Sequence, residues 1–487
     1  MTPRPSAWAS IGSVSIRALS LLLPFVLVAA CGGCNERPPT AEGGQVAVAI
    51  EREPPRAAEP AEAKQTPSAP IEPVTVRPIP GADEPGPVYV VINTKGVAKL
   101  DASGATLVLD KPERNIQDLF VGPDGAVYLL DARSLRKLVG DEVIEVVRFG
   151  FDDVAPVDEL ALGPDGTIWA TGSRGVGHHH DGRWTVSSRE QLGIGFNTDV
   201  AVAHDGTVWV AGSTKLLRRA ASGDEWLTTD IAPLGRVPLL LEMTASPTGS
   251  VLATNGKQLI RLAGDKLELT PLAGSERIAY TADLAVAPDG VIAVASGGCE
   301  LLRLPPDGRG EGWRLSREDY GCETLEAMTI DARHRIWVAA REGLSVIDEG
   351  GRAVEFPAGS FPALAGRVSH MVAVGRGPEL PDPPAVATAS LVGHIELDKA
   401  PLANTKLEAC PTVQLLGEGS PCSIAKLRLH TTTDARGRFR LEGVPIGDYS
   451  FAVEIDGVWR WTSPPSFAAQ MRAGEAHDLG MLALAKL

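Results

Sequence analysis

The chain has 487 residues and a formal net charge of −15, with 52 glycines, 38 prolines, 22% charged residues and 5% aromatic residues. So many glycines and prolines argue against a helical bundle or coiled coil, because both residues destabilise the interior of long helices. An acidic chain without basic clusters also argues against a nucleic-acid partner, because neutralising phosphates requires Lys and Arg. The length suggests about three units, although one all-β domain can exceed about 200 residues.

The first thirty residues have the pattern of an export signal. Residues 1–17 contain two arginines and no acid, and residues 18–28 form an apolar run that is short for a membrane span. Two alanines then precede Cys31, which resembles the lipobox of bacterial lipoproteins. The resemblance implies that residues 1–30 are a signal peptide and that Cys31 carries acyl chains. The alternative is an ordinary secretory signal followed by a chance cysteine.

Residues 31–84 are predicted to be a lipidated, disordered tether. The segment is rich in Pro, Ala and Glu and has too little apolar surface to offset the entropy of ordering it. Several acyl chains together would anchor the protein stably to a membrane. Gly32 is not the aspartate that often retains lipoproteins at the inner membrane. We therefore expect a cell-envelope protein, lipid-anchored at the outer membrane of a Gram-negative bacterium.

A turn motif recurs about every forty residues. Clear copies are Gly-Pro-Asp-Gly-Ala-Val-Tyr at 122–128 and Gly-Pro-Asp-Gly-Thr-Ile-Trp at 163–169. A β-branched residue stands two positions after every turn, and apolar residues stand four and six positions before the internal turns. This alternation is the strand period, and four short strands per forty residues predict a propeller blade. The turn anchors lie at positions 86, 125, 166, 206, 249, 290 and 334.

The first copy lacks an inner strand, because only the Pro-rich tether precedes Gly86. Residues 370–377 have the inner-strand pattern, and Gly377 lies one repeat after His334. We therefore predict seven blades over residues 85–378, in which this last strand completes the first blade and closes the ring. The alternative is a β-solenoid or a sandwich of similar strands.

The repeat motifs, most clearly Arg-Ile-Trp-Val-Ala-Ala-Arg-Glu-Gly-Leu at 335–344, resemble a known group of bacterial propellers. That group includes periplasmic sensors of two-component regulators and the NHL and streptogramin-lyase-like proteins. The resemblance implies the fold but leaves the function open, because propellers of this kind bind, sense or catalyse.

A second folded module is predicted at residues 389–487, after a linker at 379–388. The hairpin that begins at Asp434 and the Pro-x-Gly-x-Tyr turn that ends at Tyr449 resemble the carboxypeptidase regulatory-like, transthyretin-like β-sandwich. That family is mostly non-catalytic, and the chain has no zinc-peptidase motif. The predicted fold class is therefore all-β, with a seven-bladed propeller closed by a C-terminal strand, then a small β-sandwich.

Export to an oxidising compartment allows disulfides. Cys299 follows the second strand of blade six and Cys322 precedes the first strand of blade seven, so both loops emerge on one face and the pair can form. Cys410 and Cys422 flank a short insertion in the sandwich and are predicted to pair. Cys34 is left over, either free in the tether or paired between chains.

An acidic ring is predicted at one mouth of the central channel. Carboxylates that converge there could hold Ca²⁺ or Mg²⁺ or receive a cationic ligand. The alternative is that each acid hydrogen-bonds the backbone of its own or a neighbouring blade. The residues seven positions before each anchor are Asp118, Glu159, Asp199, Glu242, Asp283, Ala327 and His370.

Other chemistry-bearing motifs are sparse. Residues 178–180 are three consecutive histidines, which we interpret as a surface loop with incidental metal affinity. The sequence contains no nucleophile elbow, P-loop or HExxH motif.

Together these features predict a non-enzymatic binding or sensing lipoprotein that uses a propeller face, because loops on a rigid scaffold carry function. The sandwich would be a spacer or a second module for a protein or carbohydrate partner. Two alternatives remain open. One is a periplasmic enzyme of the lyase or lactonase type with a divalent metal at the channel mouth. The other is a structural scaffold in an outer-membrane complex.

Overall fold

A computed structural model describes residues 79–484, except 94, 111–115, 151–153, 155, 196, 214, 230, 232–241, 256, 273–280, 297–298, 309–311, 323, 342, 381–382, 412–418, 424 and 466. The predicted signal peptide, Cys31, Cys34 and nearly all of the tether lie outside these residues. Within the described segments, no helix is both long and apolar enough to span a membrane. The described residues belong to one compact unit.

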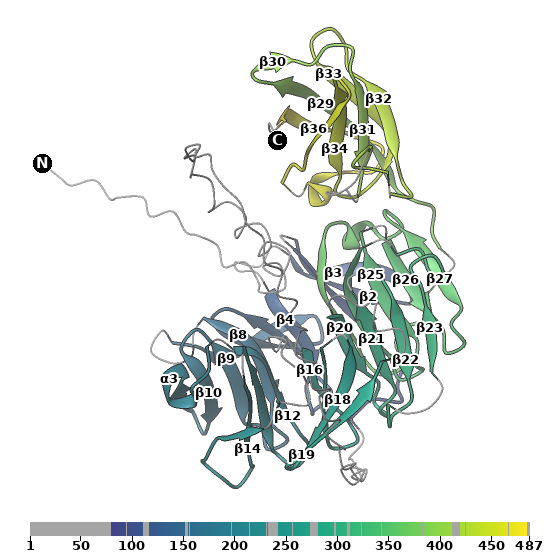
Figure 1. Ribbon diagram of the computed structural model, residues 1–487. Helices are drawn as coiled ribbons and strands as arrows, with labels where there is room; N and C mark the ends of the chain where they lie inside the picture. Colours follow the sequence, from purple (N-terminus) through teal and green to yellow (C-terminus); the bar gives the residue numbers. More distant parts are fainter. Residues whose placement is uncertain are drawn as a thin grey trace, which may run out of the picture. The chain divides into compact units, whose positions relative to one another are not determined.

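Seven four-stranded antiparallel sheets make up the larger part of this unit, and each sheet is one blade of a β-propeller. Figure 1 shows the strands β20, β21, β22 and β23 of one blade side by side. The inner strands, in blade order, are β28 (Val368–Ala373), β4 (Ile116–Val121), β8 (Val157–Leu162), β12 (Asn197–Val202), β16 (Glu242–Ala245), β20 (Thr281–Val286) and β24 (Leu325–Ile330).

The remaining three strands of each blade follow outwards in chain order. The second strands are β1 (Val88–Ile92), β5 (Val127–Asp131), β9 (Ile168–Gly172), β13 (Val208–Gly212), β17 (Val251–Thr254), β21 (Ile292–Ser296) and β25 (Ile336–Ala340). The third strands are β2 (Gly96–Asp101), β6 (Ser134–Val139), β10 (Gly175–His180), β14 (Leu216–Arg219), β18 (Gln258–Ala263), β22 (Leu301–Leu304) and β26 (Gly343–Ile347). The outer strands are β3 (Gly104–Asp110), β7 (Glu142–Arg148), β11 (Arg183–Ser188), β15 (Leu227–Thr229), β19 (Lys266–Pro271), β23 (Trp313–Leu315) and β27 (Ala353–Pro357).

Blade one is assembled from both ends of the propeller sequence. Strand β28 pairs antiparallel with β1, and Val90 lies opposite Met371 in this pairing. Each inner strand contacts the inner strand of the next blade, and β28 contacts both β24 of blade seven and β4 of blade two. The C-terminal strand therefore lies in the sheet of blade one, as the prediction of a closing strand requires.

The turn between the first two strands of a blade explains the recurring glycine. This residue has a φ of 76° to 96° in blades two to six, a conformation that side chains with a Cβ rarely adopt. His334 occupies the same position in blade seven with a φ of 60°. Histidine is one of the few other residues that tolerate this region.

The hydrophobic core lies between adjacent blades. Val91 of blade one packs with Leu119 of blade two, and Val90 packs with Trp337 and Phe356 of blade seven. All five side chains are at most 5% exposed. Burial of such a side chain stabilises the fold by about 1.5 to 3 kcal/mol, so the ring is held together at its closure as it is elsewhere.

The C-terminal module is a β-sandwich. One sheet has the order β30 (Ala400–Pro401), β29 (Thr388–Leu397), β33 (Arg438–Pro445), with β36 (Ala476–Ala483) parallel to β29. The other has the order β32 (Leu429–Thr432), β31 (Lys406–Cys410), β34 (Ser450–Ile455), β35 (Val458–Thr462). Phe439, Leu441, Tyr449, Phe451 and Val453 are buried in one core cluster, as the alternation predicts.

Two disulfides and three short helices complete the described elements. Cys299 pairs with Cys322 and Cys410 pairs with Cys422, with Cα–Cα distances of 5.8 and 5.7 Å, so both predicted pairings are confirmed. The helices are α3 (Arg189–Leu192), η3 (Pro362–Leu364) and η4 (Ala468–Gln470).

Candidate binding site

Carboxylates of the predicted acidic ring join the inner strands of neighbouring blades. Asp199 Oδ1 accepts a hydrogen bond from the N–H of Val200 in its own strand, and Oδ2 accepts one from Met243 in the next blade, both at 2.6 Å. Asp283 repeats the pattern with its own strand and with blade seven, both at 2.9 Å. These two carboxylates therefore link neighbouring blades through hydrogen bonds.

The other ring positions do not form a metal-binding cluster with them. Asp118 accepts the next backbone N–H at 2.7 Å, and His370 Nδ1 lies 3.0 Å from the hydroxyl of its neighbour. Glu159 lies in β8 and Glu242 begins β16. Among the described residues, no group of three His, Cys, Asp or Glu side chains is arranged to hold a metal ion. The cation or ligand site at this mouth stays a prediction.

A pocket of about 270 Å³ opens on the face of the ring where the inner strands begin, which we call the strand-start face. Its propeller side comes from the start of β24, the turn after β25, and residues 356–368 between β27 and β28. Its other side comes from the sandwich turn 446–450, Pro411 and residues 463–464. We call this cavity the junction pocket.

Glu326 is one of the charged residues that line the junction pocket. Its side chain is only 3% exposed, and its Oε2 accepts a hydrogen bond of 2.8 Å from the N–H of Val368. Its Oε1 lies 3.4 Å from Arg341 Nε and 3.5 Å from Arg367 Nε. One buried carboxylate is thus held by two guanidinium groups and one backbone donor.

Burial dominates the titration of this carboxyl. It raises the pKa of Glu326 from 4.5 to about 7, while Arg341, Arg367 and the Val368 N–H oppose the rise. The side chains of the two arginines are 35% and 53% exposed. In each arginine the atom that contacts Glu326 is Nε. The terminal guanidinium nitrogens of Arg341 and Arg367 have no partner among the described residues.

Apolar side chains make up much of the remaining wall. Phe356 and Phe361 line the pocket with their ring centroids 5.3 Å apart, and Leu364 and Met371 lie beside them. The sandwich contributes Tyr449, whose hydroxyl donates a hydrogen bond of 2.9 Å to the backbone carbonyl four residues earlier. This bond fixes the turn that faces the propeller, and burial raises the pKa of the tyrosine.

Asp448 is the fourth charged residue that lines the junction pocket. Its Oδ1 accepts hydrogen bonds from the N–H groups of Phe467 and Ala468, at 2.7 and 2.8 Å. Its charge also acts on Lys95, whose pKa is lowered by burial and by Arg472 and is raised in turn by Asp448. Lys95, which is outside the pocket lining, therefore offsets part of the charge of Asp448.

The sequence has an acid, Glu326, one residue before the ring position of blade seven, and the prediction of the acidic ring did not include it. In six inner strands a β-bulge falls on the residue just before the ring position, namely Gln117, Asp158, Thr198, Ala282, Glu326 and Ser369. Blade seven has Ala327 at the ring position and its acid one residue earlier, in the bulge. Bulges re-aim side chains and are common beside functional sites.

The three consecutive histidines lie in strand β10, so the prediction of a surface loop is wrong. His178 stacks on Trp169 at a centroid distance of 4.7 Å, and its Nδ1 lies 3.4 Å from an Arg219 nitrogen. His179 packs against a tryptophan of the neighbouring strand, and His180 Nδ1 lies 3.1 Å from a threonine hydroxyl. Neighbours in a strand point to opposite faces, so the three contact different groups.

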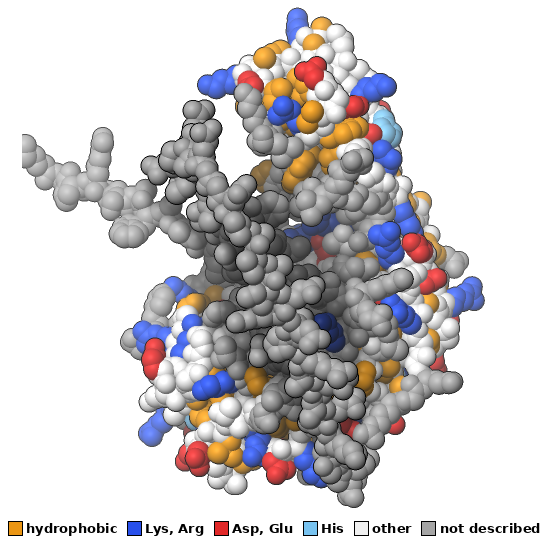
Figure 2. Space-filling model, viewed as in Figure 1, with side chains coloured by type: hydrophobic (Ala, Val, Ile, Leu, Met, Phe, Trp, Pro, Cys, Tyr) orange, Lys and Arg blue, Asp and Glu red, His pale blue; other side chains and the backbone are white. Residues whose placement is uncertain are grey.

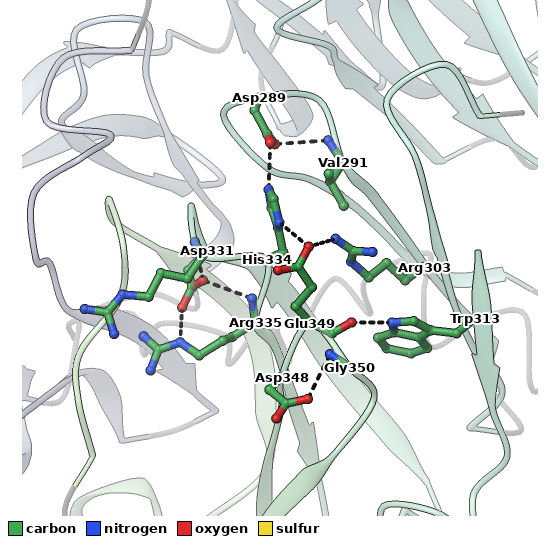
Figure 3. A network of polar contacts seen from close by, with 11 residues as sticks. Asp289, Val291, Arg303, Trp313, Asp331, His334, Arg335, Asp348, Glu349 and Gly350 are labelled. Atoms are coloured by element: carbon green, nitrogen blue, oxygen red, sulfur yellow. Dashed lines mark hydrogen bonds and ion pairs between the residues drawn. The ribbon is translucent and has the colours of Figure 1, made fainter. Parts of the chain in front are cut away.

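A polar network joins blades six and seven at the opposite end of the inner strands. Figure 3 shows His334 between Asp289 and Glu349, with Nε2 2.6 Å from the aspartate and Nδ1 3.3 Å from the glutamate. The buried Asp331 accepts hydrogen bonds from Arg335 Nε at 2.8 Å and from Trp337 Nε1 at 2.9 Å. These contacts hold the turns of the two blades together.

No protein-family model matches the sequence, and no curated protein is significantly similar to it. Solved structures of β-propeller proteins are similar to part of it. Virginiamycin B lyase from Staphylococcus aureus is 15% identical, with 55% of this chain and 95% of that chain covered and a TM-score of 0.41. YCF48 bound to D1 peptide is 14% identical, with 50% of this chain and 82% of that chain covered and a TM-score of 0.37. A putative gluconolactonase is 17% identical, with 49% of this chain and 90% of that chain covered and a TM-score of 0.34. The fold assignment rests on the strand pairing described above.

Proposed function

We propose that the chain is an envelope-anchored lipoprotein that binds a ligand at the strand-start face of its propeller, without catalysis. The junction pocket carries this proposal, because a concave, largely apolar cavity with a few convergent charged groups is the usual form of a ligand site. The channel-mouth carboxylates Asp199 and Asp283, in contrast, are engaged by backbone N–H groups.

The anchor part of the proposal rests on the residues that lead to Cys31 and on the tether that follows. A tethered propeller could reach a soluble ligand while it remained at the membrane. Figure 2 shows acidic and basic side chains interspersed over the visible described surface, so that this view has no single basic patch of the kind that nucleic acid would require.

The other two functions have weaker support among the described residues. The metal-dependent lyase or lactonase has no cluster of three metal-ligating side chains. For the scaffold, the outer strand β7 exposes Ile144 and Val146 to 48% and 47%, which is a small apolar strip rather than a large patch.

A ligand screen with a blocked pocket tests the binding proposal. Ala358 lines the junction pocket from the turn after β27, so Ala358→Trp is expected to fill it. Ala102→Trp, on an exposed turn of blade one, is the matched control. Compounds that bind should raise the melting temperature of the wild-type chain and of Ala102→Trp, but not of Ala358→Trp. Equal stabilisation of all three chains would contradict binding in the pocket.

A further inference from the structure

The charges and the apolar wall of the junction pocket together define a class of ligand. We propose that the pocket binds a small organic carboxylate with an apolar body, the carboxylate pairing with Arg341 and Arg367 and the body packing on Phe356 and Phe361. This inference rests on the proposed function of the pocket as a binding site and names what it would bind.

An anion suits the polar end of the pocket better than a cation does. Both oxygens of Glu326 are already engaged, by two arginines and by the Val368 N–H. The Glu326 side chain is also only 3% exposed, and a ligand amine would have to compete with these partners for it. The terminal nitrogens of Arg341 and Arg367 still offer N–H donors, and guanidinium groups bind carboxylates with paired, charge-assisted hydrogen bonds.

Glu326 has a further effect on such a ligand, because it holds both guanidinium groups in place before the ligand arrives. A long arginine side chain loses rotamer entropy when it binds, and a side chain that is already ordered loses less. The buried carboxylate also lowers the net charge of the pocket, so its removal would strengthen the attraction for an anion. Glu326 therefore orders the two arginines, but its negative charge weakens their attraction for an anion, and we expect the charge to have the larger effect.

The size and composition of the cavity limit the apolar body. A cavity of about 150 Å³ admits one benzene ring, so the volume of about 270 Å³ accommodates an aromatic ring with a short acid chain. Phe356 and Phe361 line the cavity and are 3% and 8% exposed, so each offers a small apolar area to such a ring. Aromatic pairs of this kind add to affinity beyond the buried area.

Isothermal titration calorimetry on the full chain tests the ligand class with three probes that share a phenylpropyl skeleton. These are 3-phenylpropionate, its neutral amide 3-phenylpropanamide, and the cation 3-phenylpropylamine. We expect the carboxylate to bind at least about tenfold more tightly than either of the others, because only it can form charge-assisted hydrogen bonds with both arginines.

Substitutions then assign the binding to the junction pocket. Arg367→Gln and Arg341→Gln should each weaken 3-phenylpropionate about tenfold, whereas Glu326→Gln should bind it as tightly as the wild type or more tightly. Arg428→Gln is the matched control, since Arg428 is 36% exposed and pairs with the mostly buried Glu408 outside the pocket. Thermal unfolding of every variant shows whether it is folded, and Arg367, the more exposed of the two, is the safer substitution.

The outcomes separate the ligand class from the proposed function. If the amine binds most tightly and Glu326→Gln abolishes its binding, the pocket recognises cations, and only the carboxylate proposal is overturned. If all three probes bind equally and no arginine variant changes their affinity, the assignment of an anion site is wrong. A third outcome is that none of the three probes binds, while other compounds still raise the melting temperature of Ala102→Trp but not of Ala358→Trp. The carboxylate proposal is then wrong, and the proposed binding function of the pocket is retained.

Discussion

Glu326 in blade seven accepts a hydrogen bond of 2.8 Å from the N–H of Val368, the first residue of the strand that completes blade one. The same carboxylate lies between Arg341 of its own blade and Arg367, which precedes that strand. One buried group thus links the last blade to the closing strand and lines the junction pocket. Its ionisation should therefore affect both folding stability and binding.

Stability should fall as Glu326 ionises. Its pKa is raised from 4.5 to about 7 in the folded chain, so the folded state holds a proton between these pH values that the unfolded state has released. The free energy of unfolding should accordingly decrease from about pH 4.5 to pH 7, by at most about 3 kcal/mol. Glu326→Gln should lack this component. Urea unfolding of both chains at several pH values measures it, and a constant difference between them would contradict the raised pKa.

Binding of an anion should show the same titration. Protonation of Glu326 below about pH 7 removes a negative charge beside both arginines, whereas 3-phenylpropionate itself remains ionised. We expect the affinity of the wild type for this probe to rise about three- to tenfold from pH 8 to pH 6. Glu326→Gln should bind with the higher affinity at both pH values. A wild-type affinity that is independent of pH would be inconsistent with this coupling.

Asp199 and Asp283, at the channel mouth, should stabilise the fold. Asp199→Ala removes the acceptor for backbone N–H groups in two blades, and we expect it to lower the free energy of unfolding by about 2 to 4 kcal/mol. Asp141→Ala, at a 77% exposed side chain that pairs with Lys99, is the control and should change it by less than about 0.5 kcal/mol. Ca²⁺ or Mg²⁺ should leave the melting temperature unchanged, and a clear rise would support a cation site at the ring.

The disulfides should contribute separately to the two modules. The cysteines of each pair are 23 and 12 residues apart, and closing loops of these lengths stabilises a fold by about 3 kcal/mol. Replacing Cys410 and Cys422 by Ser should destabilise the sandwich by that amount and leave the affinity for 3-phenylpropionate nearly unchanged. Chemical denaturation and titration calorimetry measure the two effects. Thiol alkylation of the denatured, unreduced wild type should not label these four cysteines.

Cys31→Ser tests the membrane anchor. The unmodified chain, expressed in a Gram-negative host, should fractionate with membranes and incorporate labelled fatty acid, because several acyl chains give stable anchoring. Cys31→Ser should appear in the soluble fraction without the label, while Cys34→Ser should behave as the wild type does. Membrane association of Cys31→Ser would refute the anchor.

The repeat and the ring were predictable because they depend on local chemistry. Turn glycines with positive φ mark blades two to six, and alternating apolar strands mark the repeat. The missing inner strand before Gly86 predicted that a C-terminal strand completes blade one, where Val90 lies opposite Met371. The Cys299–Cys322 disulfide was predictable because the order of strands places both loops on one face, and Cys410–Cys422 because the two cysteines flank a short insertion.

The junction pocket could not be predicted in this way, because it depends on how separate segments meet. Glu326 lies one residue before the ring position of its strand. This difference matters because Glu326 lies in a β-bulge, which changes the direction of its side chain. Nothing in the sequence indicates that Arg341, Arg367 and the turn that ends at Tyr449 meet. Only the tertiary arrangement brings them around one cavity. The packing of neighbouring blades likewise explains why the ring acids Asp199 and Asp283 accept hydrogen bonds from backbone N–H groups of the next blade.

A crystal structure of the full chain grown with 3-phenylpropionate tests the central claim most directly. Our account predicts density for the probe in the junction pocket, with its carboxylate within about 3 Å of guanidinium nitrogens of Arg341 or Arg367 and its ring against Phe356 and Phe361. A saturated crystal with the probe bound only elsewhere, or with the pocket filled by the chain's own side chains, would contradict it.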